Sequence, residues 1–258
     1  MPDFLTKLIE DAKKRVEDGY YDIHEEISHR QVSLKRAIKS AQRNAIIAEI
    51  KPISPARGPL RPEIDPVRAA KQMQAGGAVA LSVLTEPDNF GGSLENLRHV
   101  RENVQLPLLM KDMIIHERQI EAGSKMGADS ILLIESAFSN YPIASLSRMI
   151  RCAHDSQLEV LLEVHNGDEL RRALNSEADI VGLNNRNLST LETDLTTTAR
   201  LMTKADRDTD KVLISESGFE SAEDLRKVKT ARVDGFLIGS SIMLSEDLER
   251  KVREFVLA

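Results

Sequence analysis

The sequence predicts an α/β protein that is a single (β/α)8 TIM barrel with an N-terminal helical extension. Eight short apolar runs recur along the chain, and each is typical of a parallel strand that is buried on both faces. Each run followed by a helical stretch forms a βα unit, and 258 residues is close to the usual length of one such barrel. The expected strands are Ile46–Ile50, Val79–Leu84, Leu106–Met110, Ser130–Ile134, Leu158–Leu162, Ile180–Leu183, Val212–Ile214 and Gly235–Ile238.

The first 45 residues lie outside the repeat and form the predicted extension, while residues 46–258 form the barrel of the same domain. Apolar residues recur at helical spacing from Phe4 to Val16, and Gly19 is expected to end that helix. A second helix is expected from Leu34 to Gln42. These helices can cover the bottom of the barrel or reach its mouth, and the pattern does not choose between the two.

Helix boundaries inside the repeat are marked by capping residues. Asp65-Pro66 is expected to open a helix as the N-cap and first helical residue, and Gly76-Gly77 to close it. The stretch Ser221-Ala-Glu-Asp resembles a capping box, with Asp in place of the usual Glu. Because the chain shows no linker and no low-complexity tract, we expect one domain.

Composition excludes several classes of partner and cofactor. A net charge of -6 and a pI near 5.6 provide no general basic field, so we expect no nucleic-acid partner. The sole cysteine, Cys152, cannot form an intramolecular disulfide, and the His and Cys residues lack zinc-ligand spacing. We assign no role to His165, which follows Glu163 by two residues. Without a GxGxxG motif or a P-loop, we expect neither a metal nor a cofactor.

The start of the chain and its hydropathy favour the cytoplasm. The first residues lack the apolar core of a signal peptide, and no apolar run approaches the length of a transmembrane helix. We therefore expect a cytoplasmic protein with no membrane partner.

Polar residues stand at the ends of most predicted strands, where the active sites of such barrels lie. Residues two apart in a strand share a face, so Glu49 and Lys51 point the same way, as do Asn184 and Arg186. One charge at a strand end is commonly just a solvated side chain, but lysines, an arginine and carboxylates that converge inward predict a catalytic mouth. The residues expected there are Glu49, Lys51, Lys111, Glu163, Asn184, Arg186 and Glu216.

Glycines after the last two strands indicate a phosphate site. Ser217-Gly218 follows the seventh predicted strand, and Gly239-Ser240-Ser241 follows the eighth. Glycine lets the backbone approach a ligand closely, and N–H groups at the start of a helix bind anions. Barrels of this kind commonly hold phosphate after strands seven and eight, although two ordinary tight turns are the alternative.

Seven stretches follow one another in order on the expected strands. They are Ala48-Glu-Ile-Lys-Pro-Ile-Ser-Pro, Leu81-Ser-Val-Leu-Thr-Glu with Phe90-Gly-Gly-Ser, Leu109-Met-Lys-Asp, Leu161-Leu-Glu-Val, Gly182-Leu-Asn-Asn-Arg-Asn-Leu, Ser215-Glu-Ser-Gly and Leu237-Ile-Gly-Ser-Ser. In these stretches the chain resembles the indole-3-glycerol phosphate synthase family, which closes the indole ring in tryptophan biosynthesis. The resemblance runs from about residue 44 to the C-terminus, and the helical extension also suits the family.

The resemblance implies a lyase that decarboxylates its substrate and works without a cofactor. Such enzymes convert 1-(2-carboxyphenylamino)-1-deoxyribulose 5-phosphate to indole-3-glycerol phosphate and release CO₂ and water. Lys111 would be the general acid at the substrate ketone, and Glu163 the general base. Lys51 would hold the aromatic carboxylate and donate a proton during dehydration. The residues that would orient and balance these groups are Glu49, Asn184 and Glu216.

The resemblance also implies a set of binding residues. Arg186 would position the substrate. The phosphate-binding residues would be Ser54, Ser217, Gly218, Gly239 and Ser240, and the apolar walls around the ring Phe90, Leu132, Leu188 and Ile238. The chain departs from the family pattern at Met113, where phenylalanine is usual in the substrate pocket, and at Pro52-Ile53 and Ala56. Methionine fills such a place more flexibly and stacks less well on an aromatic ring.

The chemistry independently requires this inventory. When an aromatic carbon attacks a ketone, the developing alkoxide needs a positioned acid, and loss of the resulting hydroxyl as water needs a base. Lys51 and Arg186 should lower the pKa of the Lys111 ammonium, while Glu49 and Glu163 oppose that effect. The expected partner is a small phosphorylated substrate. We expect a monomer or weak homo-oligomer, and association with other tryptophan-pathway enzymes is a further possibility.

Three alternatives remain open from the sequence. A class I aldolase would use a strand-end lysine as a Schiff-base nucleophile. A phosphoribosylanthranilate isomerase would share the fold and the phosphate site, but is expected to carry a cysteine base where this chain has Glu49. A barrel retained only as a binding or assembly module would not need the charged mouth.

Overall fold

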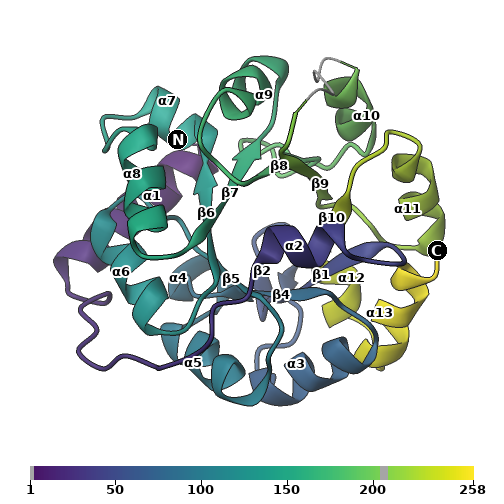
Figure 1. Cartoon of the computed structure of the whole chain (residues 1–258), viewed down its shortest axis with the longest axis horizontal. Coiled ribbons are helices and arrows are strands. Elements are labelled where there is room, and N and C mark those ends of the chain that lie inside the picture. Colours follow the sequence, from purple (N-terminus) through teal and green to yellow (C-terminus); the bar gives the residue numbers. More distant parts are fainter. Residues whose placement is uncertain (1–2, 204–208) are drawn as a thin grey trace.

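The computed structural model of the chain describes residues 3–203 and 209–258. Within them, eight parallel strands close into one barrel surrounded by helices, which confirms the predicted fold (Figure 1). Around the barrel the strands follow the order β1-β10-β9-β8-β7-β6-β5-β4. They are β1 (Ala45–Ile50), β4 (Ala80–Leu84), β5 (Leu108–Lys111), β6 (Ser130–Ile134), β7 (Glu159–Val164), β8 (Ile180–Asn184), β9 (Val212–Glu216) and β10 (Gly235–Ile238). The loop after β1 adds a small antiparallel pair, β2 (Ile53–Ser54) and β3 (Gly58–Pro59).

Every predicted apolar run overlaps one strand, and β6 and β10 match the expected bounds at both ends. Strands β7 and β9 extend two residues beyond the predicted runs and so include Glu163 and Glu216. The predicted ends fall too early because backbone pairing continues past the last apolar residue, with Ile134 opposite Glu163 and Asn184 opposite Glu216. These polar residues are therefore held by the hydrogen bonds of the sheet rather than by loops.

Side chains alternate between two apolar layers along each strand. Ile46 belongs to the layer between strands and helices, whereas Ile47 belongs to the cluster inside the barrel. Further along the inner face, Glu49 follows Ile47 and Glu163 follows Leu161. The apolar interior thus ends in polar side chains at the carboxyl ends of the strands.

Helices cover the outside of the barrel and join successive strands (Figure 1). They are α3 (Pro66–Ala75), α4 (Pro87–Phe90), α5 (Leu94–Asn103), α6 (Glu117–Lys125), α7 (Glu135–Asn140), α8 (Leu146–Asp155), α9 (Gly167–Leu174), α10 (Thr196–Met202), α11 (Ala222–Lys229), α12 (Ser240–Met243) and α13 (Leu248–Val256). In the two described ranges, no helix has both the length and the apolar character needed to span a membrane.

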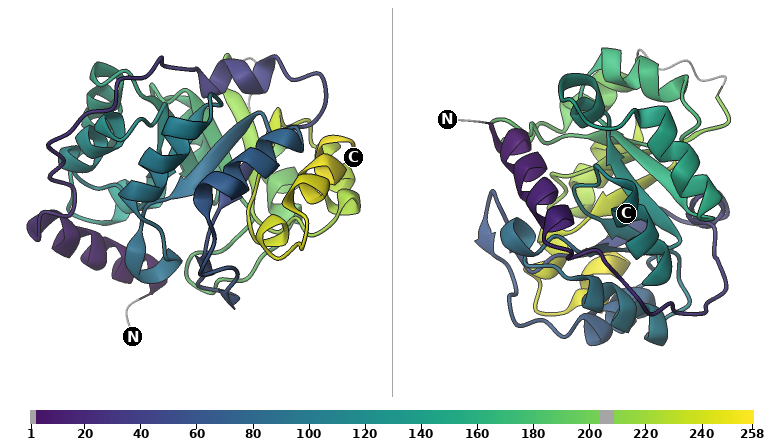
Figure 2. Two further views of the ribbon diagram at one scale, coloured as in Figure 1. Left: turned by 90° about the horizontal axis from the view of Figure 1, so that it is seen from below. Right: turned by 90° about the vertical axis from the view of Figure 1, so that its left-hand side faces the viewer.

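The two helices of the extension cover opposite ends of the barrel. They are α1 (Phe4–Glu17) and α2 (Leu34–Lys39), and Figure 2 shows them on opposite sides of the strands. Phe4 of α1 lines the cavity at the carboxyl ends of the strands. Ile38 of α2 lies close to Gly235, the first residue of β10. The sequence left open whether these helices cover the bottom of the barrel or reach its mouth. In the structure α1 reaches the mouth and α2 covers the bottom.

The helix boundaries in the extension match the prediction at one helix and not at the other. The first helix ends shortly before Gly19, as predicted. The second ends at Lys39, so the predicted end at Gln42 is wrong by three residues. The N–H of Ser40 donates to the carbonyl of Arg36 and closes the helix, because the chain must then turn toward the start of β1.

Capping residues predicted inside the repeat are confirmed. Asp65 caps α3 by accepting the backbone N–H of Val67, and Gly77 follows the helix with a φ of +96°. Ser221 and Asp224 form a reciprocal capping box at the start of α11. Asp therefore replaces the usual Glu without loss of the motif.

Asp129 fastens the extension to the barrel. Its carboxylate accepts the backbone N–H of Val32 in the extension and of Leu108 in β5, both at 2.8 Å. It also lies 2.9 Å from the guanidinium of Arg101 on α5, whose side chain is 2% exposed. One buried carboxylate thus joins three segments that are distant in the sequence.

Asp129→Asn is expected to lower the free energy of unfolding by about 3–5 kcal/mol, because Arg101 would be left buried beside a neutral partner. Denaturant unfolding provides the measurement. Asp155→Asn, at an exposed position near the end of α8, is the control and should change stability by less than about 0.5 kcal/mol. Equal unfolding midpoints for the two variants would contradict the role of Asp129.

Candidate active site

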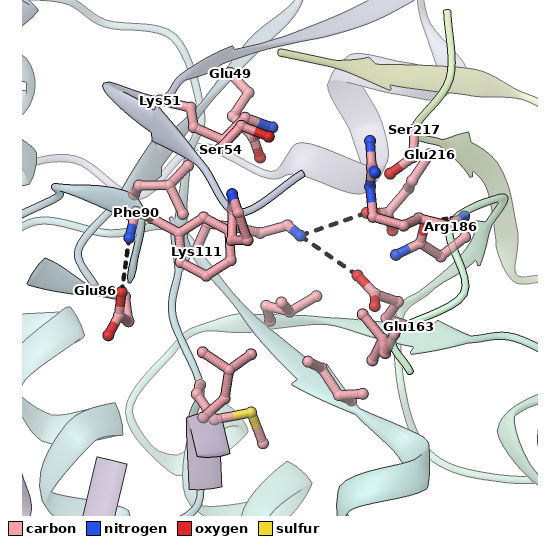
Figure 3. A pocket seen from close by; sticks show the side chains of 18 of the residues that line it. Glu49, Lys51, Ser54, Glu86, Phe90, Lys111, Glu163, Arg186, Glu216 and Ser217 are labelled. Carbon is pink, nitrogen blue, oxygen red and sulfur yellow. Dashed lines mark hydrogen bonds and ion pairs between the residues drawn. The ribbon is translucent and has the colours of Figure 1, made fainter. Parts of the chain in front are cut away.

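A cavity of about 820 Å³ opens at the carboxyl ends of the strands, where the fold places active sites. Its polar lining comes from β1, β5, β7, β8 and β9 and from the loops that follow these strands and β4 (Figure 3). All seven polar residues expected at the mouth line this cavity; they are Glu49, Lys51, Lys111, Glu163, Asn184, Arg186 and Glu216. Among residues 3–203 and 209–258, no group of three or more His, Cys, Asp or Glu side chains is arranged to hold a metal ion.

Lys111 ends β5 and carries the central positive charge of the cavity. Its Nζ lies 3.4 Å from Glu163 Oε2 and 3.6 Å from Glu216 Oε2 (Figure 3). Burial disfavours the ammonium, but Glu163, Glu216 and Glu49 outweigh burial and raise the pKa of Lys111 above its usual range. Of the opposing effects expected from the sequence, that of the carboxylates prevails.

Glu49 and Lys51 form a second ion pair on the wall of the cavity. Lys51 Nζ lies 2.7 Å from Glu49 Oε1, and the Ser82 hydroxyl donates to Glu49 Oε2 at 3.3 Å. Burial opposes ionisation of Glu49, but Lys51 and Lys111 hold its pKa below the usual value. A Cβ at Gly239 would lie 2.5 Å from Glu49 Oε1, so this glycine leaves room for the pair.

Glu216 is the carboxylic acid of the cluster that retains its proton most strongly. Burial raises its pKa to about 8; Lys111 opposes this shift, while Glu163 and Glu49 add to it. At neutral pH its side chain is therefore largely uncharged. A Cβ at Gly182 would overlap Glu216 Oε1, so the strand needs glycine at that position. Gly182 opens one of the motifs quoted above, but that motif alone did not indicate that the glycine makes room for the Glu216 carboxyl group.

His165 is a member of the cluster that the sequence analysis missed. Its Nε2 lies 3.1 Å from Glu163 Oε1, and its Nδ1 lies 3.2 Å from Glu169 Oε2. Burial lowers the pKa of His165, but the two carboxylates outweigh burial and raise it to about 10. Burial also opposes ionisation of Glu163, yet Lys111 and His165 hold its pKa well below the usual range. The available signal was the spacing, since His165 follows Glu163 by two residues.

Four of the five apolar residues expected around the substrate ring line the main cavity. They are Phe90, Met113, Leu132 and Leu188. The fifth, Ile238, packs in the layer between strands and helices and borders an adjoining cavity, and Leu237 lines the main cavity in its place. The two differ because neighbouring residues of a strand face opposite sides. Phe4 and Leu8 of α1 complete the apolar wall, a contribution that the sequence did not indicate.

A buried network joins the extension to this wall. Glu86 accepts the backbone N–H of Phe90 at 3.0 Å and pairs with Arg15 of α1 at 2.8 Å. Arg15 also lies 3.8 Å from Asp112, the residue after Lys111. Burial raises the pKa of Asp112 to about 6 despite that cation. Helix α1 therefore supports both the aromatic wall and the strand end that carries Lys111.

The adjoining cavity, of about 780 Å³, lies beside the loops after β9 and β10 and shares Lys51 and Arg186 with the main cavity. Four of the five expected phosphate-binding residues line it; they are Ser217, Gly218, Gly239 and Ser240. Ser54 lines the main cavity instead. Arg57, which the sequence analysis did not single out, adds a third cationic side chain.

The backbone of the adjoining cavity suits an anion. Ser217 and Gly218 have φ values of 69° and 92°, in the left-handed region that serine rarely occupies. Such strained residues cluster at ligand sites, and consecutive N–H groups in a tight turn can face a common anion. The buried Ser241 hydroxyl borders this cavity and has no hydrogen-bond partner among the described residues.

Similarity to a solved structure of low sequence identity supports the fold and nothing beyond it. Thiamine phosphate pyrophosphorylase from Pyrococcus furiosus matches with a TM-score of 0.61 at 15% sequence identity, over 86% of this chain and 96% of that one. An identity this low carries no conclusion about activity.

Sequence comparison identifies the family. The family model described as indole-3-glycerol phosphate synthase matches residues 5–255. The protein of that name from Aquifex aeolicus is 39% identical over 255 residues, which cover 99% of this chain and 92% of the relative. That from Methanocaldococcus jannaschii is 43% identical over 88% of this chain and 84% of the relative. This agreement over nearly the whole length shows that the chain belongs to the indole-3-glycerol phosphate synthase family.

Proposed function

We propose that this chain closes the indole ring with Lys111 as the general acid and Glu163 as the general base. As a member of its family, the chain is a carboxy-lyase of tryptophan biosynthesis that acts on a small phosphorylated substrate. The substrate is 1-(2-carboxyphenylamino)-1-deoxyribulose 5-phosphate, and the products are indole-3-glycerol phosphate, CO₂ and water. The observation that carries the assignment is the pairing of Lys111 with the buried Glu163, two oppositely charged groups 3.4 Å apart in the cavity.

Lys111 is suited to protonate the substrate ketone. When the aromatic carbon attacks, negative charge develops on the ketone oxygen, and an ammonium can stabilise it and donate a proton. The ionised carboxylates of Glu163 and Glu49 keep the Lys111 proton in place before substrate binds. A ketone that enters between Lys111 and Glu163 separates the pair, which lowers the pKa of Lys111 and makes its proton easier to give up.

The same separation exposes one oxygen of Glu163 to the substrate. The ring carbon that attacks the ketone bears the carboxylate, so loss of CO₂ restores the benzene ring, and Glu163 then takes the carbon-bound proton that is lost with the hydroxyl as water. The low pKa of Glu163 makes it a weak base, but loss of this proton completes the aromatic indole and is therefore favourable. A weak base is therefore sufficient, provided that it is ionised and correctly placed. This requirement matches a carboxylate that is held charged by its neighbours.

The remaining polar residues hold the substrate and balance charge. Lys51 faces the aromatic carboxylate and supplies a proton for dehydration, while Glu49, 2.7 Å away, holds its ammonium in place. Arg186 positions the substrate, and its backbone N–H donates to the Asn184 side chain at 2.9 Å. Glu216 is largely protonated at pH 7, so it can contact Lys111 without adding a full negative charge to the cluster.

The phosphate and the aromatic ring occupy opposite sides of the catalytic group. Backbone N–H groups and cationic side chains of the adjoining cavity bind the phosphate. The residues assigned to the phosphate are Ser54, Arg57, Ser217, Gly218, Gly239 and Ser240. The apolar wall, including Phe90 and Met113, packs against the ring.

The charge state of Lys111 argues against the aldolase alternative. A Schiff-base nucleophile must be a free amine, so such lysines have lowered pKa values. Here the surrounding carboxylates raise the pKa of Lys111. That environment favours an acid over a nucleophile.

We infer a monomer or weak homo-oligomer in the cytoplasm. Within the described residues, the large hydrophobic side chains that lie exposed are Leu244 and Leu257, which are too few for an extensive apolar interface. Association with other tryptophan-pathway enzymes stays a prediction from the sequence.

Glu163→Gln keeps the size of the side chain and removes its charge, so kcat should fall by roughly 10²–10⁴ while KM changes little. The chain contains no Trp, which gives a low background for following indole fluorescence. The control is Glu223→Gln, on the exposed face of α11. The base assignment is wrong if both variants lose activity equally.

Lys111→Met should abolish turnover yet leave substrate affinity within about tenfold, because the phosphate and carboxylate contacts remain. Lys111→Arg should be nearly as damaging, since a guanidinium does not give up its proton. We expect no adduct when wild-type enzyme, substrate and borohydride are combined and intact mass is measured. A trapped adduct on Lys111 would instead support the aldolase reading.

The phosphate group should contribute strongly to catalysis. A substrate that lacks it should lose about 100-fold or more in kcat/KM, comparable to two hydrogen bonds to a charged group. Inorganic phosphate should inhibit competitively, and Arg57→Gln should raise KM more than Arg148→Gln, an exposed control on α8. Steady-state kinetics test all three, and a phosphate-free substrate that is used equally well would place the phosphate outside the site.

A further inference from the structure

We propose that His165 is a positioning residue for the base. Held between Glu163 and Glu169, it keeps the Glu163 carboxylate ionised and oriented when Lys111 turns toward the substrate ketone. The inference rests on the proposed function, because it takes Glu163 as the base.

Both ring nitrogens of His165 face carboxylate oxygens. Nε2 lies 3.1 Å from Glu163 Oε1 and Nδ1 lies 3.2 Å from Glu169 Oε2. A neutral imidazole has one N–H and one lone pair, so only an imidazolium presents a proton to both carboxylates. Nε2 lies close enough to Oε1 for the imidazolium to stabilise the Glu163 carboxylate directly.

Each oxygen of Glu163 has its own cationic neighbour. Oε1 faces His165, whereas Oε2 faces Lys111 at 3.4 Å. A ketone that draws Lys111 away therefore frees Oε2 to accept the carbon-bound proton that is lost during dehydration. Oε1 stays beside the imidazolium, so the carboxylate keeps one cation and one fixed direction.

The imidazole is anchored outside the main cavity. Glu169 stands in the first turn of α9 and is 6% exposed. Its Oε2 accepts the backbone N–H of His165 at 2.7 Å, and its Oε1 accepts the Asn166 side chain at 2.5 Å. These bonds fix His165 at the junction between β7 and α9, so the ring is held beside Glu163 without entering the main cavity.

The other charged groups nearby do not replace this cation. On α7, Glu135 is paired with Arg172 of α9 at 2.5 Å. On β8, Asn184 bears no charge, and on β9, Glu216 is largely protonated at neutral pH. Among the described residues, the cations that pair with Glu163 are Lys111 and His165.

Glu216 shows what happens to a neighbouring carboxyl group without such a partner. Glu163 and Glu216 are equally buried and lie at similar distances from Lys111. The pKa of Glu216 is raised to about 8, whereas that of Glu163, which also contacts His165, is held well below its usual range. His165 contacts Glu163 directly but acts on Glu216 only as a more distant charge, and Asn184 also favours the ionised form of Glu163.

His165→Gln tests the proposal because glutamine can present an N–H but carries no charge. The measurement is kcat/KM from pH 5 to pH 9.5, whose acid limb reports the pKa of the base in the free enzyme. Wild type should show no acid limb in this range, because the pKa of Glu163 is held well below its usual value, whereas the variant should show one, with a loss of about tenfold in kcat/KM at pH 5.5. At pH 9 the value should return to within about threefold of wild type, because Glu163 ionises there without help.

The matched control is His99→Gln, which removes an exposed histidine that pairs with Glu95 on α5 at 3.0 Å. Its pH profile should equal that of wild type. A second measurement does not need a folded His165 variant: nitrogen NMR of the wild-type imidazole should show both ring nitrogens of His165 protonated at pH 8. Glu163→Gln should weaken that protonation.

The outcomes separate the two proposals. Equal loss at every pH in His165→Gln, with an unmoved acid limb, would indicate a merely structural role and overturn the inference. A neutral His165 at pH 8 in the wild-type protein would overturn it as well. An active Glu163→Gln enzyme would overturn the proposed function, and the inference with it. An inactive Glu163→Gln enzyme beside an unchanged His165→Gln profile would leave the function intact and remove His165 alone.

Discussion

The balance of buried charge at the mouth of the barrel is the constraint on which the rest of the site depends. Three carboxyl groups surround Lys111, and a buried charge is tolerated only when an opposite charge or a retained proton compensates it. The cluster uses both solutions, since Glu49 and Glu163 are ionised beside cations while Glu216 keeps its proton. Chemistry then follows from disturbing this balance, because any substrate that separates the partners changes the affinity of each for a proton.

Small residues and a distant helix make this arrangement possible. Gly182 and Gly239 leave space for carboxylates that a larger side chain would displace, so their role here concerns the acids as well as the backbone. Arg15 reaches from α1 to Glu86 and Asp112, and thereby supports the aromatic wall and the end of β5 together. The site thus depends on the strand ends that carry the polar residues, on the glycines that make room for them and on a helix that lies outside the repeat.

Much of the fold and the polar inventory followed from local pattern. Buried parallel strands read as apolar runs, and residues two apart share a face, so the convergence of Lys51 with Glu49 was predictable. Features that depend on contact between distant segments could not be predicted in this way. The pairing of Arg15 with Glu86 and the side of β10 on which Ile238 lies needed the register of the closed barrel. His165 was passed over because a histidine's role depends on which groups face its ring.

The placement of α2 has a consequence for how the protein is made. The extension leaves the ribosome before the strands of the barrel, but Ile38 lies near Gly235, which belongs to the last strand. The floor of the barrel therefore cannot be sealed until nearly the whole polypeptide has been synthesised. Contacts this far apart in sequence are slow to form, so α2 must wait, exposed, while the intervening βα units gather. A segment that is translated before every strand of the barrel is then among the last to find its final place.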